Sequence, residues 1–374
     1  MIAKISPNLF CDYFSEKKYI NAIVSYNPRV RCYIKDKGVR ITERFPFAHC
    51  VAIEMDKNNL FSLSKNVNVN YICSVQEVSS QIELTKKIMS VNTISSNEFN
   101  GEGQTLCFID TGICPHIDFC LGENRIKHFE DLINHRQKAY DDNGHGTMVA
   151  GMAIGSGLTS CGKYCGIAPR AKVVAVKSMN EDGAGSSMDI LRGMQWVYDN
   201  RRKYGINVLC MSLGAESMGS IDPLMQGAET LCQAGICVVT ASGNSGGKST
   251  IKSPGISPQS ITAGSFDDFR TLSRDDDKVA AFSSCGPTVL GSKPDLLVNG
   301  VNICGASDFS LTKNMYETYS GTSVSAAVLA GVCLILSQKL KTNNVSTIKA
   351  ELKKFCVKKE NDENVEGAGY LYFN

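Results

Sequence analysis

Three short segments of the chain each surround one reactive side chain with small residues. Asp110 lies in the run IDTG, His145 in NGHGT and Ser323 in SGTSVSA. A serine hydroxyl is a poor nucleophile at neutral pH, so it needs a base to take its proton, and an imidazole base needs a carboxylate that fixes its tautomer. The chain supplies one candidate for each role, which predicts hydrolysis through a serine nucleophile.

Each of these residues also has an ordinary structural explanation when it is taken alone. Asp110 could cap the element that follows it, and Ser323 could be only the N-cap of a helix. His145, between two glycines, could stand at a helix terminus without a catalytic role. Their presence together, in the order Asp, His, Ser, favours catalysis over three unrelated caps.

The elements around these residues indicate how they would be positioned. Beyond Thr105, continuous runs of β-branched residues alternate with amphipathic segments, which predicts a mostly parallel α/β sheet covered by helices on both faces. Ligand sites in such sheets lie beyond the carboxyl ends of the strands. Asp110 stands at such an end, and His145 and Ser323 stand where helices begin. The predicted strands span residues 105–110, 171–177, 206–212 and 236–242, and the predicted helices span 145–155, 186–204, 222–234 and 323–340.

The first 80 residues differ in texture from the rest of the chain, because they are rich in Asn and Lys and their apolar segments are short and alternating. This pattern predicts a small α+β domain over residues 1–80, followed by a catalytic domain over 81–374 that begins with a polar connection at 81–104. The predicted elements of the small domain are strands at 19–26, 38–45, 48–55 and 69–75 and a helix at 58–65.

Composition and charge narrow the classes of partner. The formal net charge is +2, which gives no electrostatic reason to expect a nucleic acid or an anionic membrane as partner. The sequence holds no run of 18 or more apolar residues and no signal-peptide core in its first fifteen residues. We therefore expect a cytoplasmic protein that binds neither membrane nor nucleic acid.

The sixteen cysteines are many for such a protein. Those inside apolar runs are expected to be buried free thiols that pack as small hydrophobic side chains: Cys107, Cys210, Cys237 and Cys333. Cys161 and Cys165 flank a Gly-rich loop and could approach each other. No pair has the spacing of a metal finger, and a disulfide framework is the less favoured alternative.

The three motifs together resemble those of the subtilisin-like serine protease family, over roughly residues 80–374. The resemblance implies a doubly wound, mostly parallel α/β sheet and a serine endopeptidase that works through an acyl-enzyme. It also implies Asn244, in ASGNSG, as the side-chain donor of the oxyanion hole. Ser212, Leu213 and Gly214 are implied to be the strand edge that pairs with extended substrate backbone.

Several segments match or depart from the family pattern without carrying chemistry. Residues 282–287 and the run KPD at 293–295 match structural signatures of the family. Met148 replaces a frequent second histidine, and Asn299 replaces a proline. The loop at 155–166 lacks the Asn- and Asp-rich composition of the family's high-affinity calcium loop, so no cofactor is predicted, although other calcium sites stay open.

The resemblance also suggests a substrate preference and a maturation step. Matching the run SP places Lys252 near the floor of the pocket for the residue before the scissile bond (P1), where a lysine would favour an acidic side chain; a solvated surface lysine is the alternative. Residues 19–78 resemble the family's propeptide, an intramolecular chaperone and inhibitor, and cleavage after Glu77 would suit that pocket.

Three other interpretations remain open at this level. The N-terminal domain could be a permanent accessory domain. The chain could be a catalytically silent pseudoprotease that serves as a binding module, although an intact set of Asp110, His145, Ser323 and Asn244 argues against this. It could also be a dedicated maturation protease for one peptide precursor, with an acidic P1 preference, rather than a general protease.

Overall fold

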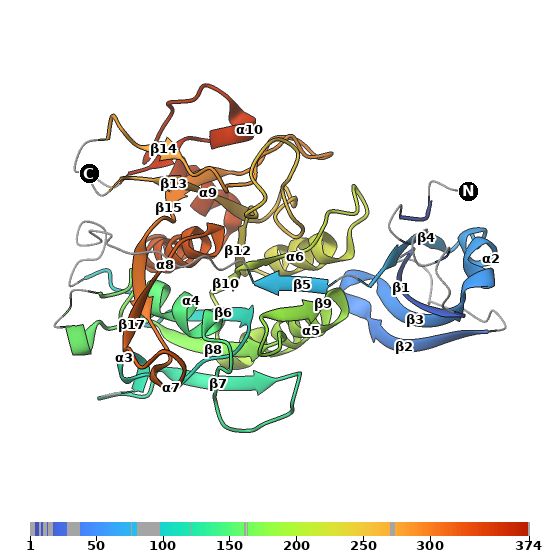
Figure 1. Cartoon of the computed structure of the whole chain (residues 1–374), viewed down its shortest axis with the longest axis horizontal. Helices are drawn as coiled ribbons and strands as arrows, with labels where there is room; N and C mark the ends of the chain where they lie inside the picture. Colours follow the sequence, from blue (N-terminus) through green and yellow to red (C-terminus); the bar gives the residue numbers. More distant parts are fainter. Residues whose placement is uncertain are drawn as a thin grey trace.

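The computed structural model describes residues 4–6, 9, 13, 18–27, 38–75, 77–80, 98–120, 122–160, 162, 164–269 and 274–372, with the backbone alone for 77–80. Figure 1 shows a small N-terminal sheet beside a larger α/β unit that holds the rest of the described chain. Cys161 and most of the predicted connection lie outside the described residues, so the expected approach of Cys161 to Cys165 and the boundary near residue 80 stay predictions.

The larger unit is built on a mostly parallel sheet, as the sequence predicts. All neighbouring strands from β19 to β7 run parallel, whereas β18 and β14 (Lys278–Val279) pair antiparallel at the side of the sheet. The order across the sheet is β18 (Cys356–Val357), β19 (Tyr370–Leu371), β15 (Leu296–Asn299), β13 (Ile261–Asp267), β12 (Cys237–Ala241), β10 (Val208–Met211), β6 (Thr105–Asp110), β8 (Lys172–Lys177) and β7 (Ile126–Asp131).

Helices cover both faces of this sheet, because the buried strands are apolar on both sides. Along β6, Leu106 and Phe108 join the core beneath α4 (His145–Ile154), α8 (Thr322–Leu340) and α9 (Val345–Lys353). Cys107 and Ile109, between them in sequence, join the core beneath α5 (Ser187–Tyr204) and α6 (Pro223–Gln233). The predicted doubly covered architecture is therefore confirmed.

Local signals fix the helix ends within about a residue of the sequence-based prediction. The Ser186 side chain accepts from the Asp189 amide in a capping box at the start of α5, and Gly205 ends that helix in the left-handed conformation at φ 61°. Asp222 caps α6 by accepting from the Met225 amide, and Pro223 occupies its first turn.

α8 is apolar around its whole circumference. Among the described residues it is the helix whose length and hydropathy would suffice to cross a bilayer, yet 83% of its most apolar window is buried inside the protein. The helix packs against α4 and against β10, β12 and β13, so it is the central core helix on that face of the sheet.

The N-terminal unit is an antiparallel sheet in the order β2 (Val39–Phe45), β3 (Cys50–Asp56), β1 (Tyr19–Tyr26), β4 (Val69–Ser74). Two predicted elements begin two residues later than expected. The strand predicted from residue 48 begins at Cys50, because Pro46 opens a 3-10 turn over Pro46–Ala48. The helix predicted from residue 58 is α2 (Leu60–Ser64), because Asp56 accepts from the Asn58 amide and holds Lys57–Asn59 in a 3-10 turn.

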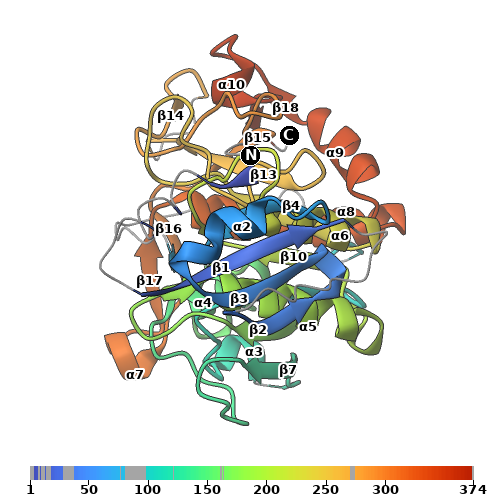
Figure 2. The same cartoon turned by 90° about the vertical axis from the view of Figure 1, so that its right-hand side faces the viewer.

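This small sheet lies between its own helix and the larger unit. One face packs with α2 around Ile53, Leu60 and Leu63. The other face turns Phe45, Phe47 and other apolar side chains into the same core as α5 and α6. Figure 2 views the structure from the side of the small sheet, with α5 and α6 behind it.

Candidate active site

Three adjacent strands of the large sheet end at one place. β10 lies between β6 and β12, and all three run parallel. Asp110 is the last residue of β6, Ser212 follows β10, and Asn244 comes shortly after β12. α4 begins with His145, and Ser323 is the second residue of α8. The carboxyl edge of the sheet thus gathers the residues that the motifs single out.

Asp110 and His145 form a fully buried pair. His145 Nδ1 lies 2.7 Å from Asp110 Oδ1, and this oxygen also accepts from the Thr111 amide at 2.8 Å. Because the carboxylate accepts from Nδ1, the proton of the neutral imidazole sits there and Nε2 is left as an acceptor. Nε2 is buried and has no hydrogen-bond partner among the described residues. The geometry thus prepares Nε2 to take a proton.

Ser323 is fully buried in the first turn of α8, a helix that packs against α4. Its Oγ donates to the Ser212 carbonyl oxygen at 3.0 Å. The hydroxyl is therefore held at the end of β10, one strand away from the strand that ends in Asp110.

Asn244 is tied to the same helix start. Its Oδ1 accepts from both the amide and the Oγ1 of Thr322, each at 2.9 Å. Since the acceptor side of the amide group is used in this way, Nδ2 is the end that can donate to another group. The contact fixes the Asn244 side chain relative to Ser323, the next residue after Thr322.

A carboxylate that sequence reasoning missed organises the turn before His145. Asp141 accepts from the amides of Gly144 and Thr147, each at 2.8 Å, and from Thr147 Oγ1 at 2.7 Å. It also accepts from Thr111 Oγ1 at 2.9 Å, which joins this turn to the residue after Asp110. An aspartate four residues before a predicted helix start was a usable signal, because such residues commonly cap helices.

A buried lysine, also missed, supports the turn after Asp110. The Lys177 ammonium is fully enclosed and donates to Thr111 O at 2.6 Å, Met179 O at 2.8 Å and Asp142 Oδ1 at 2.6 Å. An enclosed ammonium requires such partners, since burying an unpaired charge is costly. Lys177 stands at the end of a strand that reads as apolar, so its role depends on tertiary contacts.

The glycines beside the two catalytic candidates allow the IDTG and NGHGT turns to touch. A Cβ on Gly146 would lie 2.1 Å from Gly112 O, and a Cβ on Gly112, at φ 131°, would lie 2.3 Å from Tyr140 O. Any side chain at these positions would push the turns apart. The small residues of the motifs therefore have a direct steric reason.

Two cysteines near the site are unreactive. Burial raises the pKa of the Cys210 thiol, next to Ser212, to about 12. Burial likewise raises the pKa of Cys114 to about 12. A thiol that keeps its proton at neutral pH is a weak nucleophile, so neither cysteine is favoured as a nucleophile.

The predicted substrate edge is already paired in the structure. Leu213 and Gly214 form β11, which pairs antiparallel with β5 (Glu77–Ser80) in the register Leu213↔Ser80 and Gly214↔Ser79. On its other side β5 pairs with β9 (Ala184–Ser186). The segment that follows the N-terminal sheet thus lies as the middle strand of a three-stranded sheet beside the candidate site, and Figure 1 shows β5 extending from the small unit to this place.

Lys252 lies between the two segments that frame this site. Its amide donates to Ser242 O at 2.9 Å, and its side chain lies against Gly243. The next residue, Ser253, exchanges two hydrogen bonds of 2.9 Å with Ala215, just beyond β11. The Lys252 side chain is only 14% exposed and forms an ion pair with Glu216, which is not the solvated lysine of the alternative interpretation.

The departures from the family pattern have simple structural consequences. Met148 is buried in the core beneath α4. Asn299 donates to Asp268 at 2.6 Å and accepts from the Val301 amide, so its side chain shapes the turn. Lys293 is buried against Asp295 at 2.6 Å, and burial lowers its pKa to about 8, which fits a packing role for the KPD run.

A carboxylate beside the described part of the loop at 155–166 is engaged by donors of the protein itself. The nearby Asp118 carboxylate accepts from the amides of Gly157 and Leu158 at 2.9 and 3.0 Å and from the Tyr316 hydroxyl at 2.8 Å. Both carboxylate oxygens therefore face donors, whereas calcium needs several free oxygen ligands. In the described part of the chain, no three His, Cys, Asp or Glu side chains cluster as a metal would require.

Comparison with known proteins gives one consistent result. The chain matches the model of the Subtilase family over residues 101–369. It is 37% identical over 358 residues to the serine protease AprX of Bacillus subtilis (strain 168), covering 90% of this chain and 80% of that protein. It is 29% identical over 333 residues to a thermostable alkaline protease of Halalkalibacterium halodurans, covering 88% and 84% of the two chains. To the minor extracellular protease Epr of Bacillus subtilis (strain 168) it is 25% identical over 371 residues, covering 94% of this chain and 53% of Epr.

Proposed function

Because this chain belongs to the subtilase family and is a serine endopeptidase, we propose that Asp110, His145 and Ser323 are its catalytic triad. The observation that carries the proposal is the buried Asp110–His145 hydrogen bond of 2.7 Å, which leaves Nε2 as a base without a partner among the described residues. Structural caps alone would not need an imidazole held in this tautomer.

The proposed reaction follows from these contacts. Ser323 Oγ turns from the Ser212 carbonyl, loses its proton to His145 Nε2 and attacks the carbonyl carbon of the scissile bond. Asn244 Nδ2 donates to the oxyanion that forms, and such a donor contributes about 3 kcal/mol in related sites. His145 returns the proton to the leaving amine, and water then releases the acyl group from Ser323 by the same steps.

The proposed substrates are peptides or proteins that bind as an extended strand. β5 already occupies the edge of β11 in this way, so main-chain hydrogen bonds would supply affinity and side pockets would supply selectivity. This mode of binding requires no nucleic acid and no membrane as partner.

We also propose that the N-terminal unit acts on the same chain as chaperone and inhibitor, and that the enzyme cuts itself. The support is that β5 belongs to the same chain as the site and fills the proposed substrate position. The register supports a proposed cleavage site farther along the chain than the one after Glu77. Ser80 pairs with Leu213, and Ser212, whose carbonyl holds Ser323 Oγ, precedes Leu213. Because the pair is antiparallel, the scissile bond would lie beyond Ser80, whereas Glu77 pairs with Ser186 farther upstream.

Intact-mass analysis of the purified protein beside its Ser323→Ala variant tests these proposals together. We expect the wild type to lose an N-terminal fragment that ends beyond Ser80 and the variant to remain whole. A wild-type N-terminus at Val78 would restore the Glu77 site. Labelling by a fluorophosphonate probe that is abolished in Ser323→Ala distinguishes an active enzyme from a catalytically silent binding module. No contact among the described residues favours the silent module.

A further inference from the structure

The side chains around Lys252 show a residue that neither motif nor family likeness singled out. Glu216 lies two residues beyond β11, and its carboxylate forms an ion pair with the Lys252 ammonium. The two side chains differ in exposure, because Lys252 is 14% exposed and Glu216 is 68% exposed. The lysine is mostly buried between the segment before Asn244 and the segment after β11, and the glutamate reaches it from solvent.

We propose that Glu216 is a specificity-determining residue, whose carboxylate stands on Lys252 in the position that an acidic P1 side chain of the substrate would take. This inference rests on the proposed function, since it places the P1 side chain in the space beside Lys252. The backbone contacts support the placement: Lys252 is bonded to the segment before Asn244, and its neighbour Ser253 is bonded to Ala215 beyond the β11 edge.

The difference in exposure determines which side chain of the ion pair is displaced when a substrate binds. Released from the pair, Glu216 regains water at little cost, because it is already mostly solvated. Lys252 has lost most of its water and needs an anionic or polar partner wherever it stays. An acidic P1 side chain therefore displaces Glu216 rather than Lys252, and a basic one meets the enclosed ammonium.

The ion pair between Glu216 and Lys252 also weakens the preference for an acidic P1 residue. With Glu216 present, an acidic P1 residue exchanges one ion pair for another, so the net gain over a neutral polar residue is small. Without Glu216, Lys252 would form a new ion pair with an acidic P1 side chain, and binding of that side chain would be favoured over a neutral one. The wild-type enzyme therefore accepts glutamate and glutamine at P1 at comparable rates, in place of the strong acidic preference that Lys252 alone would predict.

The test compares kcat/KM for peptides that differ only in Glu, Gln or Lys at P1. We expect Glu216→Gln to raise the Glu-to-Gln ratio about fivefold, the range of a partly exposed ion pair. In a Lys252→Met background the same change should leave the ratio unaltered. Glu102→Gln, an exposed glutamate near the amino end of β6, is the matched control and should not move the ratio.

Two outcomes would overturn the inference. One is an unchanged ratio in Glu216→Gln, and the other is an equal rise in the Lys252→Met background. Glu216→Ala repeats the measurement should the glutamine variant fold poorly. Failure of the proposed function is recognised separately, because Ser323→Ala would then keep its turnover on every peptide, whatever the P1 ratio.

Discussion

The two largest sheets of the described chain bury their apolar faces in different ways. The large parallel sheet is covered on both faces by helices from its own unit, around Phe108 on one side and Ile109 on the other. The small antiparallel sheet packs one face against α2, and its second face completes its core against α5 and α6. The small unit therefore buries one face of its sheet against the large unit, whereas the residues of the proposed triad all lie in the large unit.

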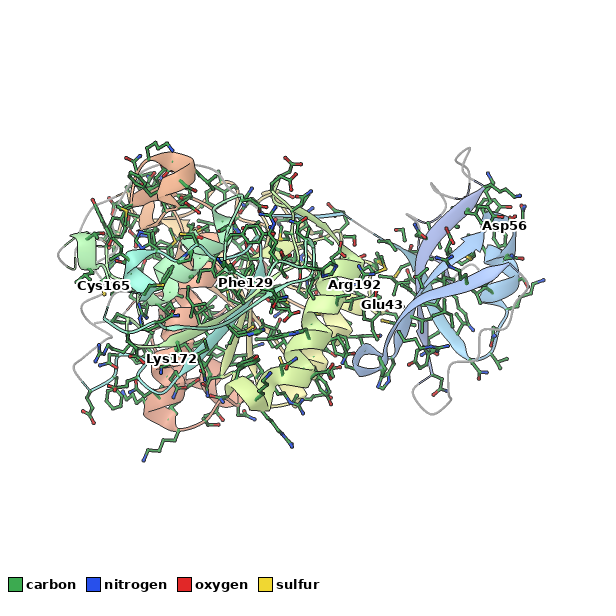
Figure 3. All side chains as sticks on the ribbon, turned by 90° about the horizontal axis from the view of Figure 1, so that it is seen from below. Glu43, Asp56, Phe129, Cys165, Lys172 and Arg192 are labelled. Carbon is green, nitrogen blue, oxygen red and sulfur yellow. The ribbon has the colours of Figure 1, made fainter. Side chains whose placement is uncertain are left out.

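The contacts between the units explain how the small sheet is held. The Phe47 and Tyr198 rings lie 6.1 Å apart between centroids, and the Tyr71 hydroxyl donates to Met218 O at 3.2 Å. Arg192 on α5 pairs with Glu43 on β2, and Figure 3 shows these two side chains meeting where the units adjoin. Apolar packing and a few polar contacts are thus spread across one interface.

The largest expected effect is a loss of activity that leaves the interface between the small and the large unit intact. His145→Ala should lower kcat/KM by about ten-thousandfold or more, since Ser323 would lose its base. Circular dichroism should show both units still folded, because the small unit packs against α5 and α6, whereas His145 begins α4. Turnover near the wild-type value would remove His145 from the proposed triad.

The next effect separates the units. In an inactive Ser323→Ala chain, Phe47→Ala should weaken the small unit by about 3 kcal/mol, the usual loss for a buried phenylalanine. Hydrogen exchange should speed up in β1 to β4 and remain slow in β6, β10 and β12. Phe309→Ala, at a 55% exposed phenylalanine of the large unit, is the matched control. Equal acceleration in both sheets would contradict the dependence of the small unit.

A smaller effect concerns the buried thiols of the large unit. Burial raises the pKa of the Cys210 thiol in the folded state to about 12, whereas the unfolded chain releases this proton above the thiol's ordinary pKa of 9.0. The stability that this thiol contributes is therefore fully present below about pH 9 and is lost as pH rises towards 12. Between about pH 8 and pH 10, the free energy of unfolding should fall by about 1 kcal/mol less in Cys210→Ala than in the parent.

Denaturant titration of the Ser323→Ala chain under reducing conditions, with and without Cys210→Ala, provides the measurement. The readout is the pH dependence, so a constant loss from the cavity left by the smaller side chain does not affect it. Identical pH dependence in the two chains would show that the folded state does not protect this thiol.

The smallest effect tests the polar part of the interface. Arg192→Met should weaken docking of the small unit by less than about 1 kcal/mol, because the side chains of Arg192 and Glu43 are 34% and 28% exposed. The difference in hydrogen exchange of β2 should disappear at high salt. Arg40→Met, which removes a pair within the small unit, is the control. A loss as large as that of Phe47→Ala would mean that charge, and not apolar burial, holds the units together.

The sequence by itself determined the elements that carry strong local signals. Six elements were predicted within a few residues of their bounds: the β-branched strands β6, β8, β10 and β12 and the capped helices α5 and α6. A strand buried on both faces and a helix cap can each be recognised from a few consecutive residues. The motif residues were likewise predicted to gather at the carboxyl ends of strands, since parallel strands end at one edge. β13 and β15 were not predicted, because their short segments owe their form to the strands beside them. α9 was also missed, although Asn344 caps it by accepting from the Thr347 amide and was a usable signal.

Only the tertiary structure decided which side chains meet. Lys177 and Glu216 were unremarkable in sequence, and each acquires its role from a partner more than 25 residues away in the chain. Asp141 could be predicted as a helix cap, but its contact with Thr111, 30 residues away, could not. The pairing of β5 with β11 and β9 joins segments far apart in sequence for the same reason. Local patterns specify what a segment forms, whereas contacts between distant segments depend on how the whole chain packs, which no short window of residues contains.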